Sequence, residues 1–203
     1  MPDTPTETPL DTLVRYLQTL RDAVLWKLDG LSEYDARRPL TPTGTNILGL
    51  VKHLAWVEAG YFGATFGRPF PEPTYPEDEE GMDHNVDMWA TAEESREDVV
   101  GQYRRVWAHV GETFAAGSLD TVGRVPWWPE ERGTVTLHQV LVHVCVETAR
   151  HAGQVDILRE RLDGAVGMRQ DATNLPDDGY DWPAHVARVE AAAVAAAEAA
   201  GER

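Results

Sequence analysis

The sequence has a single cysteine, few basic residues and no long apolar run, and each shortage excludes a class of protein. Cys145 is alone among 203 residues, so the chain cannot form an intramolecular disulfide, which fits a reducing compartment. Eighteen Lys and Arg stand against 34 Asp and Glu, for a formal charge of −16. Nucleic acid and anionic membranes are therefore not expected partners, because both are bound through clustered basic side chains. No apolar stretch reaches the roughly 18–20 residues of a membrane span, and the N-terminus has no signal-peptide pattern. These absences predict a soluble, cytoplasmic protein.

The acidic excess is concentrated between residues 70 and 98, where eleven Asp and Glu accompany one Arg. This segment also contains three prolines and little apolar periodicity. Such a composition is typical of a long solvated loop between two helices. On this interpretation the charge indicates little about a substrate.

Four stretches have the 3.6-residue apolar repeat of amphipathic helices. Thr8 and Asp11 predict a capping box at the start of the first, with Pro9 at the first helical position. Thr136 and Gln139 predict a similar cap at the start of the fourth. The expected helices cover about 8–28, 46–66, 93–116 and 136–162.

No segment alternates with a period of two, so the sequence predicts an all-α fold. Four long amphipathic helices are expected to form a four-helix bundle, and the long connections between them indicate crossovers. An Ala-rich stretch from about 182 to 200 predicts one further, marginally stable helix. We expect a single domain over 1–203, with a core at about 8–162 and a C-terminal extension at about 163–203, in a monomer or a homodimer.

The fourth predicted helix carries three polar residues at four-residue spacing. His143, Glu147 and His151 form one row on its surface. At 100° per residue, Glu147 and His151 fall inside the apolar arc and His143 falls at its edge. A carboxylate among valines is costly unless it is paired or bound to a cation.

The second predicted helix contributes His53, at the margin of its own apolar stripe. Two imidazoles and a carboxylate on facing helices are a recurring metal site in bundles. Three protein ligands leave an open position for water or substrate. Zinc suits this donor set best, and nickel or iron(II) fits it too. The alternative interpretation is an ordinary core histidine and a solvated i,i+4 pair. Cys145 lies on another face, which indicates packing rather than chemistry.

Two stretches of the sequence resemble the DinB-like superfamily of metal-dependent thiol transferases. The first runs from Thr45 to Glu58 and is followed by Tyr61-Phe62 and Gly67-Arg68-Pro69; the second runs from Thr136 to Arg159. The resemblance implies a four-helix bundle with a long crossover and a divalent metal held by His53, Glu147 and His151. Many members have a third histidine where this chain has Glu147. The short length is similar to that of the mycothiol S-transferase branch.

The resemblance also implies a reaction. A low-molecular-weight thiol, mycothiol in this branch, would bind the metal as a thiolate of lowered pKa and attack an electrophilic small molecule. No cysteine of the chain would be needed as a nucleophile. The candidates for lining the cleft or supporting the ligands are Glu58, His143, Arg150, Trp56 and Arg68. Glu58 could equally form a structural salt bridge, and Arg68 or Arg150 could hold a carboxylate of the thiol. Trp56, Trp127 and Trp128 could line the cleft or be packing residues.

Three other functions are compatible with the sequence. The bundle could bind a metal or a small ligand without turnover, since a fold does not imply a reaction. A thiol-dependent isomerase is a second possibility, although the additional C-terminal domain of the related isomerases is missing. A purely structural helical protein is the third, and it leaves Glu147 in the apolar arc unexplained.

Overall fold

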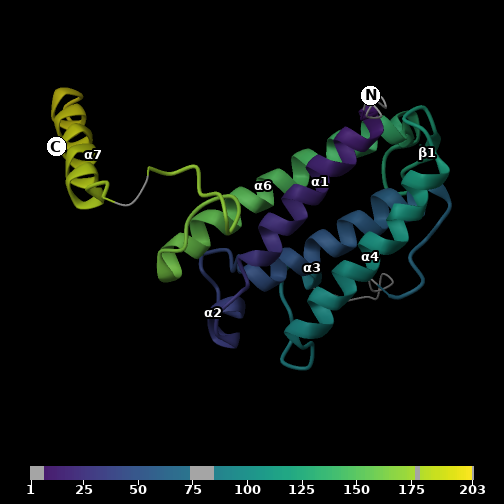
Figure 1. Cartoon of the computed structure of the whole chain (residues 1–203), viewed down its shortest axis with the longest axis horizontal. Coiled ribbons are helices and arrows are strands. Elements are labelled where there is room, and N and C mark those ends of the chain that lie inside the picture. Colours follow the sequence, from purple (N-terminus) through teal and green to yellow (C-terminus); the bar gives the residue numbers. More distant parts are fainter. Residues whose placement is uncertain (1–6, 74–84, 177–178, 203) are drawn as a thin grey trace, which may run out of the picture. The chain divides into compact units, whose positions relative to one another are not determined.

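The computed structural model describes residues 7–73, 85–176 and 179–202, and the chain divides into two compact units, 1–172 and 173–203. The described part is mostly helical, which confirms the predicted all-α class (Figure 1). The first unit contains four long helices, α1, α3, α4 and α6. Its elements are α1 (Pro9–Trp26), α2 (Glu33–Arg37), α3 (Ile47–Glu58), η1 (Ala59–Gly63), η2 (Ala64–Phe66), η3 (Val86–Met88), α4 (Arg96–Ala116), β1 (Val122–Arg124), α5 (Glu130–Gly133), β2 (Thr134–Thr136) and α6 (Leu137–Asp163).

Side-chain caps define where the long helices begin. The Thr8 hydroxyl accepts from the Asp11 backbone nitrogen at 3.1 Å, and the Asp11 carboxylate accepts from the Thr8 nitrogen at 3.2 Å, which confirms the predicted capping box. At the start of α6, the Thr136 hydroxyl accepts from the backbone nitrogen of Gln139 at 3.2 Å, which is one half of the predicted capping box. α4 starts at Arg96, slightly later than expected, because Ser95 is its cap.

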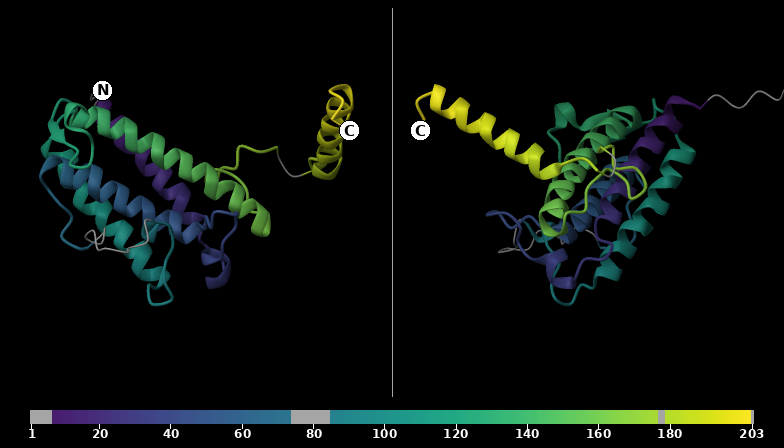
Figure 2. Two further views of the ribbon diagram at one scale, coloured as in Figure 1. Left: turned by 180° about the vertical axis from the view of Figure 1, so that it is seen from behind. Right: turned by 60° about the vertical axis from the view of Figure 1, so that its left-hand side comes forward.

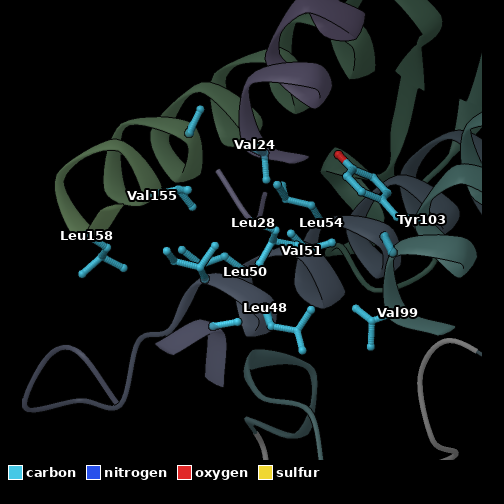
Figure 3. Packing of buried hydrophobic residues seen from close by; sticks show 14 of the residues in the cluster. Val24, Leu28, Leu48, Leu50, Val51, Leu54, Val99, Tyr103, Val155 and Leu158 are labelled. Carbon is cyan, nitrogen blue, oxygen red and sulfur yellow. The ribbon is translucent and has the colours of Figure 1, made fainter. Parts of the chain in front are cut away.

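The four long helices pack lengthwise around a common apolar core. α1 lies along α6 (Figure 2), and α3 contacts both α4 and α6. Tyr103 and a set of aliphatic side chains fill the space between them (Figure 3). The aliphatic members that Figure 3 labels are Val24, Leu28, Leu48, Leu50, Val51, Leu54, Val99, Val155 and Leu158.

The connections are more ordered than the sequence indicates. Before α6, β1 and β2 pair antiparallel as a two-stranded sheet of three residues each. Residues 74–84 of the acidic run, His84 among them, lie outside the described residues. After them the chain forms the short 3₁₀ turn η3. This turn returns to α3 and contacts it.

The end of α3 is irregular. Its last turns widen into the π-helical turn Ala59–Gly63 and then tighten into the 3₁₀ turn Ala64–Phe66, and Gly67 ends them with a φ of 71°. The sequence predicted one helix to residue 66 and did not predict this change of winding. π-helical turns are frequent at functional sites.

The second unit contains α7, Trp182–Ala199, which confirms the predicted Ala-rich helix. Asp181 caps it by accepting from the backbone nitrogen of Ala184 at 2.8 Å. Within the described residues, no helix combines the length and apolar character needed to cross a membrane.

Candidate metal centre

His53 of α3 and the pair Glu147 and His151 of α6 converge on one point. Their nearest possible ligand atoms all lie within 4.8 Å of one another. The Glu147 Oε1 atom is 3.1 Å from His151 Nε2 and 3.6 Å from His53 Nε2. The structure thus brings together the three residues that the sequence and the resemblance indicated.

The far side of each imidazole is held by an oxygen. Nδ1 of His53 lies 2.6 Å from Oδ2 of Asp87, and Nδ1 of His151 lies 2.8 Å from Oε1 of Gln154. A carboxylate or amide oxygen can only accept a hydrogen bond, so each Nδ1 carries a hydrogen. With a hydrogen on Nδ1, a neutral imidazole presents its Nε2 lone pair towards Glu147, whereas a protonated imidazole donates from Nε2 to the carboxylate, as the 3.1 Å contact from His151 allows.

Two ring nitrogens and a carboxylate oxygen at these separations share positive charge, which either protons on the imidazoles or a cation between them can supply. With nitrogen and oxygen ligands about 2.0–2.2 Å from a tetrahedral zinc, neighbouring ligand atoms lie roughly 3.3–3.5 Å apart. The two measured separations from Glu147 bracket this range. The outer hydrogen bonds to carboxylate and amide oxygens are also those that orient histidines bound to metals. The donor set therefore fits a divalent cation such as zinc.

Glu147 is less enclosed than its place in the apolar arc suggests, because about a third of its side chain is exposed. Burial raises the pKa of the Glu147 carboxyl, but the positive charges and hydrogen bonds of His151 and His53 outweigh burial and lower it below the ordinary value of 4.5. The carboxylate is thus ionised at neutral pH and open to ligands from solvent.

Asp87 is the important residue that the sequence analysis missed. It lies in the acidic segment interpreted as solvated loop, yet it is 95% buried, with an exposed fraction of 5%. Gly49 lets η3 approach α3, since a Cβ on Gly49 would lie 1.9 Å from the Met88 carbonyl oxygen. Lys52 donates to the Trp89 carbonyl at 3.1 Å and holds the chain just beyond Asp87. No local pattern marks Asp87 as a partner of His53, because the contact depends on the return of the segment to α3.

A mostly apolar cavity of about 580 Å³ opens beside His53. The π-helical turn contributes to it: Gly60 and Tyr61 both line it, and Trp127 forms a further wall. A Cβ on Gly60 would lie 2.8 Å from the Trp127 ring, so glycine is what allows that ring to lie against the turn. Trp56 also lines the cavity, as the sequence analysis considered.

Tyr61 connects the cavity to α6 through ring contacts. Its ring meets those of Trp127 at 5.1 Å, Trp128 at 6.0 Å and His143 at 4.7 Å between centroids. Its hydroxyl accepts from Trp128 Nε1 at 3.2 Å. His143 therefore belongs to an aromatic cluster one turn before Glu147, and among the described residues the group that could hold a metal consists of His53, Glu147 and His151 without it.

The remaining candidates lie apart from the trio. Arg68 forms an ion pair with Glu112 of α4. Arg150 is exposed and lines a separate cavity beside Gln154. Glu58 lies in the core, where it pairs with Arg21 of α1.

Replacement of Asp87 by Ala should weaken zinc binding by about 10- to 100-fold, as for other partners of ligating histidines. The variant keeps all three ligands but leaves Nδ1 of His53 without its acceptor, so the ring loses basicity and orientation. Competition with a zinc indicator measures the affinity. Asp120→Ala, in the loop after α4, is the control. Unchanged zinc affinity in Asp87→Ala would contradict the role given to Asp87.

Cys145 is expected to react slowly with thiol reagents. Burial raises the pKa of its thiol above the ordinary 9.0, and the charge of Glu58 raises it further. The thiolate is the reactive form. At pH 7–8 a disulfide reagent should therefore modify Cys145 in the folded protein more slowly than it modifies a small free thiol, and the rate should rise when the protein is unfolded in urea. A native rate equal to the unfolded rate would contradict this assignment.

Comparison with known protein families identifies a match over most of the chain. The sequence model of a family described as Mycothiol-S-transferase matches residues 12–164. This range contains the three converging residues as well as Asp87 and Gln154. No curated protein sequence matches the chain.

Proposed function

Because the chain belongs to the mycothiol-S-transferase family, we propose that it is a metal-dependent enzyme that joins mycothiol to an electrophilic small molecule. The observation that supports this most directly is the convergence of three lone-pair donors with oriented imidazoles. In this proposal α1, α3, α4 and α6 form a four-helix bundle of the DinB type, and the reaction takes place in the reducing cytoplasm, where the thiol is available.

In the proposed site, His53, Glu147 and His151 hold the divalent cation, zinc by preference. When bound, the cation supplies a Lewis acid that lowers the pKa of a thiol and so provides a thiolate at neutral pH. Asp87 and Gln154 fix the two imidazoles, which keeps both Nε2 atoms directed at the same point. The exposed third of Glu147 marks the side from which a thiol can approach.

The chain's own side chains also set what the thiol meets. The cavity beside His53 is large enough for a small organic molecule, and its walls are mostly apolar. Holding the electrophile next to the thiol makes the reaction effectively intramolecular, which is a major source of rate enhancement. Cys145, whose thiol stays protonated, takes no part.

The test is conjugation of mycothiol to 1-chloro-2,4-dinitrobenzene by zinc-loaded protein, followed by absorbance. Wild type should exceed the uncatalysed rate, and His151→Ala should return it to that rate. His138→Ala, an exposed histidine on the same helix, should keep full activity. If zinc-loaded wild type and His151→Ala give equal rates with mycothiol, bacillithiol and glutathione, the bundle binds metal without this turnover.

A further inference from the structure

The walls of the cavity beside His53 indicate which electrophiles can enter it. Eight described residues line it, and most of the surface they offer is carbon. Trp56, Tyr61 and Trp127 supply three aromatic side chains, with Val57 and Ala64 between them. Flat apolar walls favour planar ligands that stack on these rings and bury their own apolar surface.

The charge of the cavity is equally one-sided. Among its described lining residues the ionisable ones are His53, Tyr61 and Asp87, and none is Lys or Arg. Lys52, one residue before His53, does not line the cavity; its Nζ lies 5.0 Å from the centroid of the Trp56 ring, where Glu94 at 2.8 Å neutralises its charge. Asp87 and Glu147 contribute two carboxylates close to His53. A divalent cation would offset these two charges, and an arriving thiolate would add one negative charge again.

From these two features, and resting on the proposed function, we propose that the cavity receives neutral, planar, apolar electrophiles and rejects anionic ones, with Trp127 as the residue that determines this specificity. An anion would lose its hydration in a partly buried site whose described lining supplies no Lys or Arg and where the charges of Asp87 and Glu147 already balance a bound divalent cation. With an aryl chloride, the thiol sulfur forms a bond to the ring carbon, chloride leaves with the bonding electrons, and the thiol proton passes to water.

Trp127 is suited to this role because its position depends on one glycine. The ring is half exposed and packs edge-on against Tyr61. Gly60 leaves the space that it occupies, in the π-helical turn. Removal of the indole therefore opens the cavity without emptying the helical core.

Binding of unreactive compounds separates this inference from catalysis. Methyl 3-nitrobenzoate and 3-nitrobenzoate have the same ring and differ in charge at pH 7. Equilibrium dialysis against metal-free and zinc-loaded protein should give at least tenfold tighter binding of the ester in both forms. Trp127→Ala should weaken ester binding several-fold, whereas Trp182→Ala, an exposed tryptophan of α7, should leave it unchanged.

A gain of binding provides the second arm. Ala64→Lys places a cation in the wall and should raise the affinity for 3-nitrobenzoate, while Ala64→Gln, of similar length and neutral, should not. Equal binding of acid and ester by wild type, or ester binding that Trp127→Ala leaves unchanged, overturns the inference. A preserved ester preference without any conjugation would reject the transferase function and leave the cavity assignment standing.

Discussion

Glu147→Ala is expected to eliminate stoichiometric zinc binding, with a larger loss of affinity than the roughly 10- to 100-fold expected for Asp87→Ala. The variant removes one of three protein ligands and the only negative charge among them. The two imidazoles would remain in place, since Asp87 and Gln154 hold them from the other side. Elemental analysis of protein purified from zinc-supplemented cultures measures the result, with about one equivalent expected in wild type.

The matched control for this variant is Glu160→Ala, an exposed glutamate on the same helix. It should retain wild-type zinc content. Both variants should also keep the helical circular dichroism of the wild type. Full zinc occupancy in Glu147→Ala would show that the zinc is held at another site.

Arg21→Met is expected to destabilise the folded protein by about 3–5 kcal/mol, the usual cost of removing one partner of a buried ion pair. Arg21 and Glu58 are almost fully buried, and Arg21 Nε lies 3.0 Å from Glu58 Oε2. The Tyr103 hydroxyl donates to the other carboxylate oxygen at 2.8 Å. In the variant the carboxylate would keep the Tyr103 hydrogen bond but lose its cation.

Urea unfolding measures this loss. The double variant Arg21→Met with Glu58→Gln should recover a large part of the stability, because the uncompensated charge is then absent. A loss below about 1 kcal/mol in the single variant would mean that Glu58 is not held as an ion in the core. Burial, and secondarily the charge of Glu58, raise the pKa of Tyr103 well above its ordinary value, so its phenol stays protonated and continues to donate.

The helices were predictable because their signals are local. Thr8 with Asp11 and Thr136 with Gln139 mark helix starts, and each cap involves residues only three positions apart. The row of Glu147 and His151 is likewise a property of one helix. The candidate metal ligand from α3, His53, followed from its place on the helix and from the family resemblance, and the structure places it within reach of α6.

The parts that could not be predicted depend on distant segments meeting. Asp87 belongs to a charged stretch whose composition is that of a loop, and only the close approach allowed by Gly49 brings it to His53. Arg21 is 37 positions from Glu58 and has no helical pattern in common with it. The π-helical turn at Gly60 is a change in winding for which the sequence shows no periodic signal. Long-range packing, not helix propensity, decides each of these.

In the proposed reaction, one metal at this centre accepts the thiol directly. X-ray absorption at the zinc edge measures it, on zinc-loaded protein before and after mycothiol is added. The free protein should show only nitrogen and oxygen neighbours at about 2.0–2.2 Å, and the thiol should add one sulfur at about 2.3 Å. A spectrum that mycothiol leaves unchanged, at a concentration where conjugation is measured, would contradict the claim.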